Sequence, residues 1–412
     1  MARRAAWTAL ELIDGGAHYE DALLRALSDV TAQGERALCW QLVLGVLRQR
    51  SLLDAVIEAA SRRTTRNIDP AVLRCLRLGV LEARFFRTPV HAAVDQAVEL
   101  TRTVKAAHAA SFVNAVLRHQ AEFTPGADAA SGHPAWMIRR WRARWGDATA
   151  PWMAANQEPA EVYLVPREDP AGVSRAFQHA GITLLPDRGA LKLPPRVGAI
   201  PDLPGFTEGR WWVMDPAALA VADLVPDVPE VLDMCAAPGG KSFRLAARGL
   251  AVTAADNSAP RLERLRDGAA RLGMLADEHG KPGTIHVIQE DWRPESPTLS
   301  PGRWPAVLLD APCSGLGTLR RNPDIRWRRT EAELGARAQL QTSLLRAAAI
   351  MVAPGGSIVY AVCSPEPEEG PMVAASLGWP IRAVLDTSPS GAATPGGNDG
   401  QDAFWACRME RP

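Results

Sequence analysis

Apolar residues recur every three or four positions through the first 123 residues, a spacing that predicts a series of amphipathic helices. The clearest stripes are Leu23, Leu24 and Leu27; Leu42, Val43, Val46 and Leu47; Leu73, Leu76, Val80 and Leu81; and Phe112, Val113, Val116 and Leu117. Asp69-Pro70 and Thr88-Pro89 are expected helix starts. Gly34 and Gly45 are expected interruptions. Residues 1–123 are therefore predicted to form a compact all-helical domain.

Arginines accompany these helices, and two interpretations of them stay open. They are Arg62, Arg63, Arg66, Arg74, Arg77, Arg84 and Arg87. A row of this kind is typical either of a solvated polar face or of a surface that faces RNA.

The next segment, residues 124–158, combines a linker with a helix rich in Trp and Arg. Pro, Gly, Ala and Ser dominate residues 124–134, as in a linker, and the helix is expected from Trp136 to Trp145. Trp141 and Trp145 share one face of it. This arrangement favours core tryptophans with arginines that extend to solvent over a platform that stacks bases.

Shorter apolar runs follow and predict two further domains. Residues 159–214 are expected to form a small α+β module, with strands at 162–165, 182–185 and 211–213 and a helix at 173–179. From residue 215 to residue 412, strands alternate with helices, which predicts a Rossmann-like α/β domain with a parallel sheet and right-handed crossovers. A mobile loop is expected at 386–400, before a final strand at 403–407.

The amino-acid composition mainly argues against certain classes of protein and site. Of the 412 residues, 47% are apolar and 22% are charged, as in an ordinary globular protein, and the formal net charge is zero. A nucleic-acid partner would therefore have to bind local basic patches. No apolar run is long enough for a membrane helix and no signal peptide begins the chain, so we expect a cytoplasmic protein. The six cysteines are widely spaced without a Cys-x-x-Cys pair, which disfavours zinc and disulfides.

The most informative stretch is residues 229–242, which combine a strand, a glycine turn and a helix start. Val231 and Leu232 lead to Asp233, and the helical pattern begins at Ser242. In nucleotide-binding α/β sheets the ligand lies at this place, beside the helix N-terminus. The turn is not Gly-x-Gly-x-x-Gly, so a dinucleotide is a poor candidate. Lysine is rare in the chain, so Lys241 after Gly-Gly favours a compact positive charge at the turn.

The other predicted strands also end on reactive or charged residues. Asp256 follows the second strand, where a carboxylate can bind ribose hydroxyls, and Asp291 follows the third, where it can face an adenine edge. Asp310 and Cys313 follow the fourth strand, and Cys363 follows the fifth. Because parallel strands present the same ends to one crevice, we expect the two thiols and the Asp310 carboxylate to converge.

Four interpretations of this cluster compete. Buried structural cysteine is the commonest, but Cys313 and Cys363 lie in turns and not inside apolar runs. A disulfide is disfavoured in a reducing compartment, and a metal site would need further Cys or His residues. The fourth is nucleophilic catalysis. A thiolate adds to C6 of a pyrimidine, C5 then accepts a methyl group, an acid such as Asp310 supports N3, and a second thiol assists release.

Three long motifs resemble one known family. Residues 233–242, 310–327 and 362–369 are similar to the motifs of the RNA cytosine-C5 methyltransferases of the Sun/nucleolar-protein family. Residues 44–48 and 111–118 resemble the NusB-type RNA-binding domain. This fusion is typical of the family's enzymes for small-subunit ribosomal RNA, and the resemblance covers nearly the whole chain.

The resemblance implies S-adenosyl-L-methionine as cofactor and small-subunit (16S) ribosomal RNA as partner, with no metal, no membrane and a monomeric enzyme. The cofactor would lie on Cys235, Ala236, Ala237, Pro238, Gly239, Gly240 and Lys241. Asp256 would bind its ribose, Asp291 would lie near the adenine, and Asp310 would lie near the reacting end. Cys363 would be the nucleophile and Cys313 would assist release. From the residues alone these two roles stay open, because DNA cytosine methyltransferases attack from a Pro-Cys motif.

Two alternatives to this function remain: the same chemistry on transfer RNA or another RNA, and a non-catalytic RNA-binding assembly factor. The basic run after Cys313 is expected to clamp phosphates, or else to be a solvated loop. Its members are Arg320, Arg321, Arg326, Arg328 and Arg329.

The chain departs from the family pattern at three places. Val362 replaces the usual Thr before the nucleophile, Met214-Asp215-Pro216 replaces the usual Gln-Asp, and Gly370-Pro371 stands where a helix normally continues.

Overall fold

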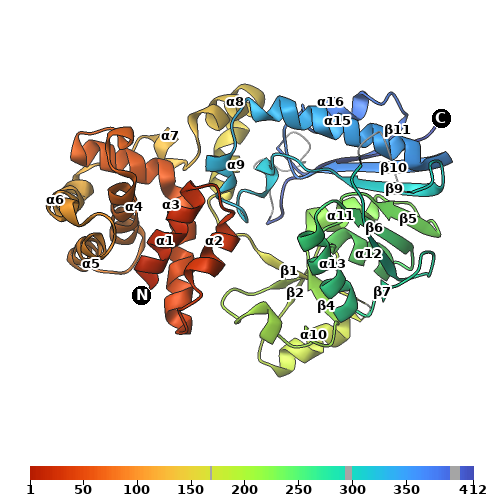
Figure 1. Ribbon diagram of the computed structural model, residues 1–412, viewed down its shortest axis with the longest axis horizontal. Coiled ribbons are helices and arrows are strands. Elements are labelled where there is room, and N and C mark those ends of the chain that lie inside the picture. Colours follow the sequence, from red (N-terminus) through yellow and green to blue (C-terminus); the bar gives the residue numbers. More distant parts are fainter. Residues whose placement is uncertain (168, 293–298, 390–399) are drawn as a thin grey trace. The chain divides into compact units, whose positions relative to one another are not determined.

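The chain folds into two compact units, shown in a computed structural model in Figure 1. The structure describes all 412 residues except residue 168, residues 293–298 and residues 390–399. One unit comprises Met1–Glu158 together with Leu319–Glu331, and the other comprises Pro159–Thr318 and Ala332–Pro412. The mobile loop expected at 386–400 falls largely outside the described residues.

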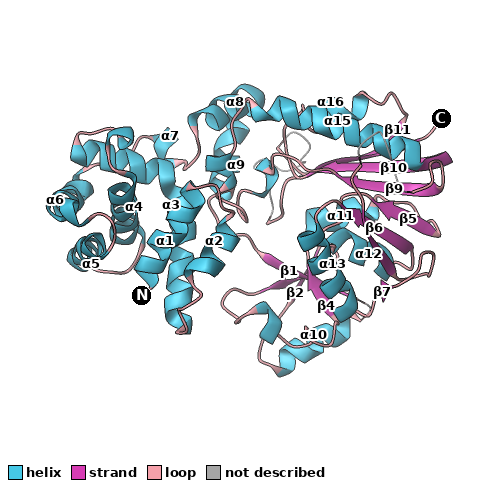
Figure 2. Cartoon of the chain, viewed as in Figure 1, coloured by secondary structure: helices cyan, strands magenta, loops and turns pink. Residues whose placement is uncertain are grey.

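The regular elements described in the first unit are all helical (Figure 2). They are α1 (Ala2–Asp14), α2 (Tyr19–Ala26), α3 (Gln33–Ser61), α4 (Pro70–Phe85), α5 (Val90–Thr103), α6 (Ala110–His119), α7 (Ala127–Ala130), α8 (Ala135–Trp145), α9 (Thr149–Ala155) and α14 (Ile325–Arg328). The predicted helical fold of residues 1–123 is confirmed. Asp69 caps α4 by accepting the N–H groups of Ala71 and Val72, as its place before Pro70 predicts.

Helix α4 is the centre of the helical unit, and every residue from Ala71 to Glu82 is buried. Two of its arginines are buried as well and are held by ion pairs, Arg74 with Asp14 at 3.0 Å and Arg77 with Asp54 at 2.7 Å. These two members of the predicted basic row therefore stabilise the core and do not form a surface. Arg62, Arg63, Arg66 and Arg87 are exposed.

The predicted interruptions of the helix at Gly34 and Gly45 are wrong, since α3 continues through both positions. A Cβ atom at Gly45 would lie 2.8 Å from a methyl carbon of Leu81 on α4, so this glycine allows α3 and α4 to approach closely. A Cβ atom at Gly34 would have no neighbouring heavy atom within 4 Å.

Tryptophans form a small core beside α8 and α9. The rings of Trp141 and Trp145 stack with centroids 5.8 Å apart, and Trp152 packs edge-on against both. Trp141 and Trp152 are fully buried. The prediction of core tryptophans in this helix is confirmed for Trp141.

The second unit begins with a four-stranded antiparallel sheet in the order β2-β3-β1-β4. Its elements are β1 (Val162–Pro166), α10 (Pro170–His179), β2 (Leu185–Asp187), β3 (Ala190–Leu193) and β4 (Trp211–Val213). The strand expected at 182–185 is shifted, because β2 forms a hairpin with β3, a strand that the apolar pattern did not reveal.

The larger sheet has eight strands in the order β11-β12-β10-β9-β5-β6-β8-β7. Its elements are α11 (Pro216–Asp223), β5 (Glu230–Asp233), α12 (Gly240–Ala247), β6 (Ala251–Asp256), α13 (Ala259–Arg271), β7 (Leu275–Ala276), β8 (Ile285–Gln289), β9 (Trp304–Asp310), α15 (Glu333–Met351), β10 (Val352–Val362), α16 (Pro371–Ala375), β11 (Ile381–Asp386) and β12 (Trp405–Glu410). The Rossmann-like α/β fold is confirmed. The prediction of an entirely parallel sheet is wrong, because β12 runs antiparallel to both β10 and β11.

Helices cover both faces of this sheet (Figure 1). Alternate residues of each strand face opposite sides, so Val231 packs in the same core as Phe243 of α12, whereas Leu232 packs in the core that contains Leu345 of α15. The sheet itself lies between these two cores. In the part of the chain that the structure describes, no helix is long and apolar enough to cross a membrane.

Gly45→Val should destabilise the protein by about 1–3 kcal/mol, because the added methyl groups overpack the contact with Leu81. Gly34→Ala, where space is open, should be neutral or stabilise by about 0.4–1 kcal/mol. Denaturant unfolding followed by circular dichroism measures both. Equal effects of the two substitutions would contradict the close approach of α3 and α4.

Candidate active site

Two cysteines meet at the carboxyl ends of neighbouring parallel strands. Strands β9 and β10 pair in register, with Asp310 opposite Ala361, and each chain then turns out of the sheet. Cys313 lies in the first turn and Cys363 in the second, and their sulfur atoms are 3.3 Å apart. Both thiols are free and partly exposed. The sheet thus brings together two sulfurs that are separated by 50 residues in the sequence.

Asp310 is paired with a lysine from the glycine turn. The Nζ of Lys241 donates a hydrogen bond of 2.5 Å to Oδ2 of Asp310 and lies 4.9 Å from the centroid of the Phe404 ring. Burial alone would lower the pKa of Lys241, but attraction to Asp310, their hydrogen bond and the negative charge of Cys363 raise it. Lys241 therefore keeps its charge and faces both the carboxylate and the thiol.

The surroundings of Cys313 affect its protonation. The hydrogen bond with Cys363 raises the pKa of Cys313 most, followed by burial and by the charges of Cys363, Glu369 and Asp310. These surroundings therefore favour the protonated form of Cys313, which can donate toward the Cys363 sulfur. Lys241 interacts electrostatically with Cys363, whereas Glu369 and Asp310 are among the charges that raise the pKa of Cys313.

The glycine turn is built for close approach at the start of α12. Gly239 has φ of +114°, and a Cβ atom there would lie 2.6 Å from the ring of Phe243. No side chain caps α12, so its first N–H groups point into the turn. Burial, and then the charges of Asp256, Asp233 and Asp310, raise the pKa of Cys235, which stays a neutral thiol within the turn.

Carboxylates line the same turn. Asp256 is buried, accepts N–H groups from Ala237 at 3.3 Å and Ser258 at 3.0 Å, and lies 3.7 Å from Arg261. Asp233 is buried, and its Oδ1 accepts no hydrogen bond within the described structure. Burial is the main cause that raises the pKa of Asp233 to about 7. Such a donor and acceptor set fits a polar ligand with hydroxyl and ammonium groups, as the sequence predicts for S-adenosyl-L-methionine.

Asp291 lies two residues beyond the end of β8 and is exposed. Its neighbour Trp292 is buried and donates a hydrogen bond of 2.6 Å to the carbonyl of Met234, which holds this segment beside the glycine turn. The N–H of Glu290 bonds to the carbonyl of Asp256 at 3.2 Å. The suggested contact of Asp291 with an adenine stays a prediction.

The sequence did not reveal the polar residues behind the cysteines. Glu369 is buried and accepts hydrogen bonds from Ser314, Ser364 and Gln341. Both serines directly follow the two cysteines, so the repeated Cys-Ser dipeptide at 313–314 and 363–364 was the available signal. No pattern in the sequence pointed to Gln341, which lies within α15.

Two of the three departures from the family pattern have structural roles. Asp215 caps α11 by accepting the N–H of Ala217 at 2.9 Å and also accepts the N–H of Asp402 at 3.1 Å. A helix does begin at Gly370-Pro371, although α16 is short, and a Cβ atom at Gly370 would lie 2.9 Å from the Trp405 ring. Val362 is buried in the sheet opposite Trp405.

The phosphate clamp expected after Cys313 is wrong for its central member. Arg326 is fully buried in the helical unit, where it donates to the carbonyls of Asn156 at 2.5 Å and Arg48 at 3.2 Å. Burial, and then the charge of Arg48, lower its pKa to about 9. Arg320 is buried too, and Arg328 pairs with Asp324 at 2.9 Å. Arg326 thus holds the segment Leu319–Glu331 within the helical unit.

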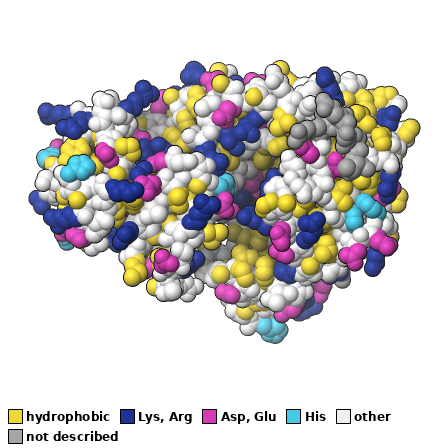
Figure 3. All heavy atoms as spheres, viewed as in Figure 1, with side chains coloured by type: hydrophobic (Ala, Val, Ile, Leu, Met, Phe, Trp, Pro, Cys, Tyr) yellow, Lys and Arg dark blue, Asp and Glu magenta, His cyan; other side chains and the backbone are white. Residues whose placement is uncertain are grey.

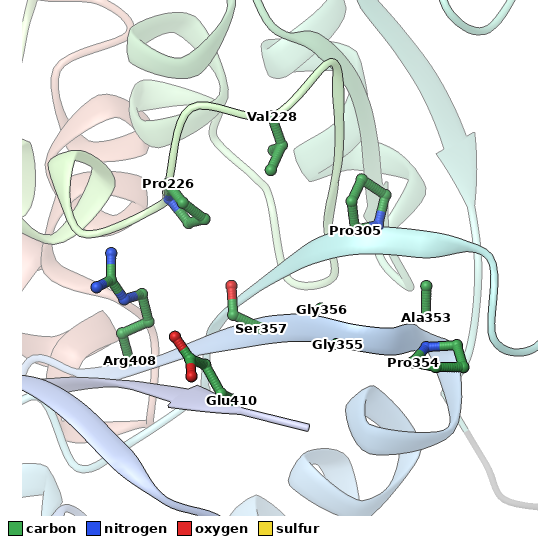
Figure 4. Close-up of a pocket in the computed structure, with 10 residues that line it drawn as sticks. All are labelled: Pro226, Val228, Pro305, Ala353, Pro354, Gly355, Gly356, Ser357, Arg408 and Glu410. Carbon is green, nitrogen blue, oxygen red and sulfur yellow. The ribbon is translucent and has the colours of Figure 1, made fainter. Parts of the chain in front are cut away.

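Further surface features are visible in Figures 3 and 4. On the visible face of the helical unit, basic side chains are scattered among hydrophobic and acidic ones (Figure 3). The pocket in Figure 4 is lined by Pro305 at the start of β9, Gly356 early in β10 and Glu410 at the end of β12. It therefore lies at the amino-terminal edge of the parallel strands, opposite the edge that carries Cys313 and Cys363.

Comparison with known proteins agrees with this architecture. Residues 223–378 match the family model described as 16S rRNA methyltransferase RsmB/F, and residues 1–122 match the NusB family. The ribosomal RNA small subunit methyltransferase B of Vibrio cholerae is 32% identical over 98% of this chain and 96% of its own length. The protein of the same name from Cronobacter sakazakii is also 32% identical, over 93% of this chain and 92% of its own.

Solved structures show the same fold. The crystal structure of PH0851 superimposes with a TM-score of 0.79 over 100% of this chain and 98% of that chain, at 23% identity. The structure of NSun6 from Pyrococcus horikoshii with SFG gives a TM-score of 0.55 over 67% of this chain and 98% of that chain, at 17% identity.

At neutral pH, iodoacetamide should modify Cys363 faster than Cys313 by about tenfold or more, because the raised pKa of Cys313 keeps it protonated and only thiolates react. Lys241→Met, which removes the nearby cation, should slow the modification of Cys363. Peptide mass spectrometry resolves the two sites. Faster modification of Cys313 would contradict the proton assignment.

Proposed function

We propose that this chain, which belongs to the 16S rRNA methyltransferase RsmB/F family, methylates C5 of a cytosine in small-subunit ribosomal RNA. It is an S-adenosyl-L-methionine-dependent RNA methyltransferase. One observation carries the finer proposal: two free thiols 3.3 Å apart, beside the ion pair of Lys241 with Asp310. A ribosomal RNA substrate also agrees with the names of the relatives from Vibrio cholerae and Cronobacter sakazakii.

The glycine turn and its carboxylates are the proposed cofactor site. The residues of the turn are Cys235, Ala236, Ala237, Pro238, Gly239, Gly240 and Lys241. Asp256 would bind the ribose hydroxyls, Asp291 would face the adenine, and Asp310 would lie at the reacting end. When bound, the cofactor supplies an electrophilic methyl group. The uncapped start of α12 and the unpaired Oδ1 of Asp233 offer further polar contacts to it.

Cys363 is the proposed nucleophile. Its sulfur forms a bond to C6 of the cytosine, and the electrons of the C5–C6 double bond move toward N3, so that C5 becomes nucleophilic. The hydrogen bond between Lys241 and Asp310 carries a proton, and this pair can pass that proton to N3 as negative charge develops there. The target base must leave its stack to reach the thiol.

Cys313 is the proposed assistant of product release. After methylation the N3 proton returns to the Lys241–Asp310 pair and the C5 proton leaves to solvent. The C5–C6 double bond then re-forms, and the bond between C6 and the Cys363 sulfur breaks. The Cys313 sulfur lies 3.3 Å from that sulfur and its surroundings favour the protonated form, so it can donate a hydrogen bond that stabilises Cys363 as the departing thiolate. The protonation of Cys313 therefore favours this division of roles over the reverse.

Cys363→Ala should abolish transfer of tritium from labelled cofactor to ribosomal RNA, since no adduct can form at C6. Cys313→Ala should accumulate a covalent protein–RNA adduct that persists on a denaturing gel, because release loses its assistant.

Bisulfite sequencing of ribosomal RNA from cells with and without the protein identifies the modified cytosine. Loss of 5-methylcytosine from another RNA alone would contradict the substrate.

The exposed arginines of the helical unit are the proposed RNA contacts. The triple substitution Arg63→Gln, Arg66→Gln and Arg87→Gln should weaken RNA binding and reduce the slope of log K against log salt by about 2, since each phosphate contact contributes about 0.7–0.9. Cofactor affinity should stay unchanged. The matched control is Arg382→Gln, because Arg382 is an exposed arginine of the other unit that pairs with Glu410. An unchanged salt slope in the triple variant would exclude this surface.

A further inference from the structure

A buried carboxylate lies behind the two thiols. The side chain of Glu369 is fully buried and forms no ion pair with the described residues. Its Oε1 accepts the N–H of Ser314 at 2.7 Å and the amide of Gln341 at 3.1 Å. Its Oε2 accepts the hydroxyl groups of Ser364 at 2.6 Å and of Ser314. An ionised carboxylate only accepts hydrogen bonds, and its two oxygens can accept all four of these.

Three of these four donors come from the two cysteine turns, and the fourth, Gln341, lies in α15. Ser314 follows Cys313 and Ser364 follows Cys363, and the two serine hydroxyl oxygens are 3.1 Å apart. One carboxylate therefore bridges two segments that are separated by 50 residues in the sequence. Because Ser314 contributes its backbone N–H as well as its hydroxyl, the first turn is held by its main chain.

Neighbouring contacts fix the position of the carboxylate itself. The hydroxyl of Tyr360, inside β10, donates to the backbone carbonyl of Glu369. Gln341 uses the amide that bonds to Glu369 to reach the carbonyl of Pro312 as well, at 3.1 Å. The N–H of Gly317 bonds to the carbonyl of Cys363 at 3.0 Å. The network is thus anchored to β10 and α15 and joined directly to both turns.

We propose that Glu369 is a positioning residue that holds the sulfurs of Cys313 and Cys363 in register by bridging the serines that follow them. The catalytic role of this spacing rests on the proposed function, in which both thiols act on the substrate. Two thiols that act on one carbon–sulfur bond must lie within hydrogen-bonding distance, and a shift of about 1 Å in such a pair costs on the order of 100-fold in rate. Glu369 sets this spacing without reaching the substrate.

The charge of Glu369 supports the same arrangement of the two thiols as its hydrogen bonds do. It is one of the groups that raise the pKa of Cys313, after the hydrogen bond with Cys363, burial and the charge of Cys363. The carboxylate thus favours the protonated form of Cys313, the form that donates toward Cys363. Its effect should be visible in the reactivity of the two thiols without any RNA present.

Glu369→Gln tests the proposal, since the amide keeps the shape but turns donor hydrogens toward Ser314, Ser364 or Gln341. We expect the ratio of iodoacetamide modification at Cys363 to that at Cys313 to fall by about tenfold. We expect kcat for RNA methylation to fall on the order of 100-fold. The dissociation constant for S-adenosyl-L-methionine should stay within about twofold of wild type, because the glycine turn is untouched. The matched control is Glu278→Gln at an exposed position.

Two further variants separate positioning from charge and from folding. Glu369→Asp keeps the charge but is shorter, so it should fail to restore the modification ratio, whereas a purely electrostatic role would be rescued. Ser364→Ala removes one of the four donors, so it should lower the modification ratio in the same direction as Glu369→Gln but by a smaller factor. It replaces Glu369→Gln as the test if that variant does not fold. If Glu369→Gln folds and its ratio of modification at Cys363 to that at Cys313 equals that of the wild type, the proposal is overturned. If Glu369→Gln does not fold, a wild-type ratio in Ser364→Ala overturns it. Failure of the wild-type protein to methylate RNA would overturn the proposed function alone, because the thiol ratio is measured without RNA.

Discussion

The parallel pairing of β9 with β10 is the constraint on which the site depends. It places Ala361 opposite Asp310, so the two chains leave the sheet side by side and at the same edge. The turn after each strand then needs only a few residues to bring Cys313 and Cys363 within 3.3 Å. Strand β5 pairs with β9 on the other side, which delivers the glycine turn and Lys241 to the same edge.

Charge at this edge is arranged asymmetrically. Lys241, mostly buried against Phe404, provides the cation, and Asp310 accepts its hydrogen bond. Glu369 is bonded to Ser314 beside Cys313, and its charge is one of the causes, after the hydrogen bond with Cys363 and burial, that raise the pKa of Cys313. Two identical functional groups therefore acquire different roles from their surroundings alone, as often happens when neighbouring charges separate the pKa values of a pair.

The sequence predicted most of the sheet and the convergence of the cysteines, because strand ends, the glycine turn and helical periodicity are local patterns. It could not predict β12 as an antiparallel strand, since the direction of a strand depends on its partner and not on its own residues. It also misjudged Arg326, because an arginine in a basic run looks the same whether it meets phosphate or buried carbonyl groups. Glu369 was missed for a similar reason: its partners come from three separate segments.

The central claim is that Cys363 forms the covalent bond and Cys313 assists its cleavage. An RNA substrate with 5-fluorocytosine at the target position tests it most directly, because the fluorine at C5 cannot leave as a proton does and the adduct is trapped after methyl transfer. Mass spectrometry of the nucleotide-linked peptide should find the RNA attached to Cys363. Attachment to Cys313, or no attached peptide from an RNA that is methylated in its unfluorinated form, would contradict the account.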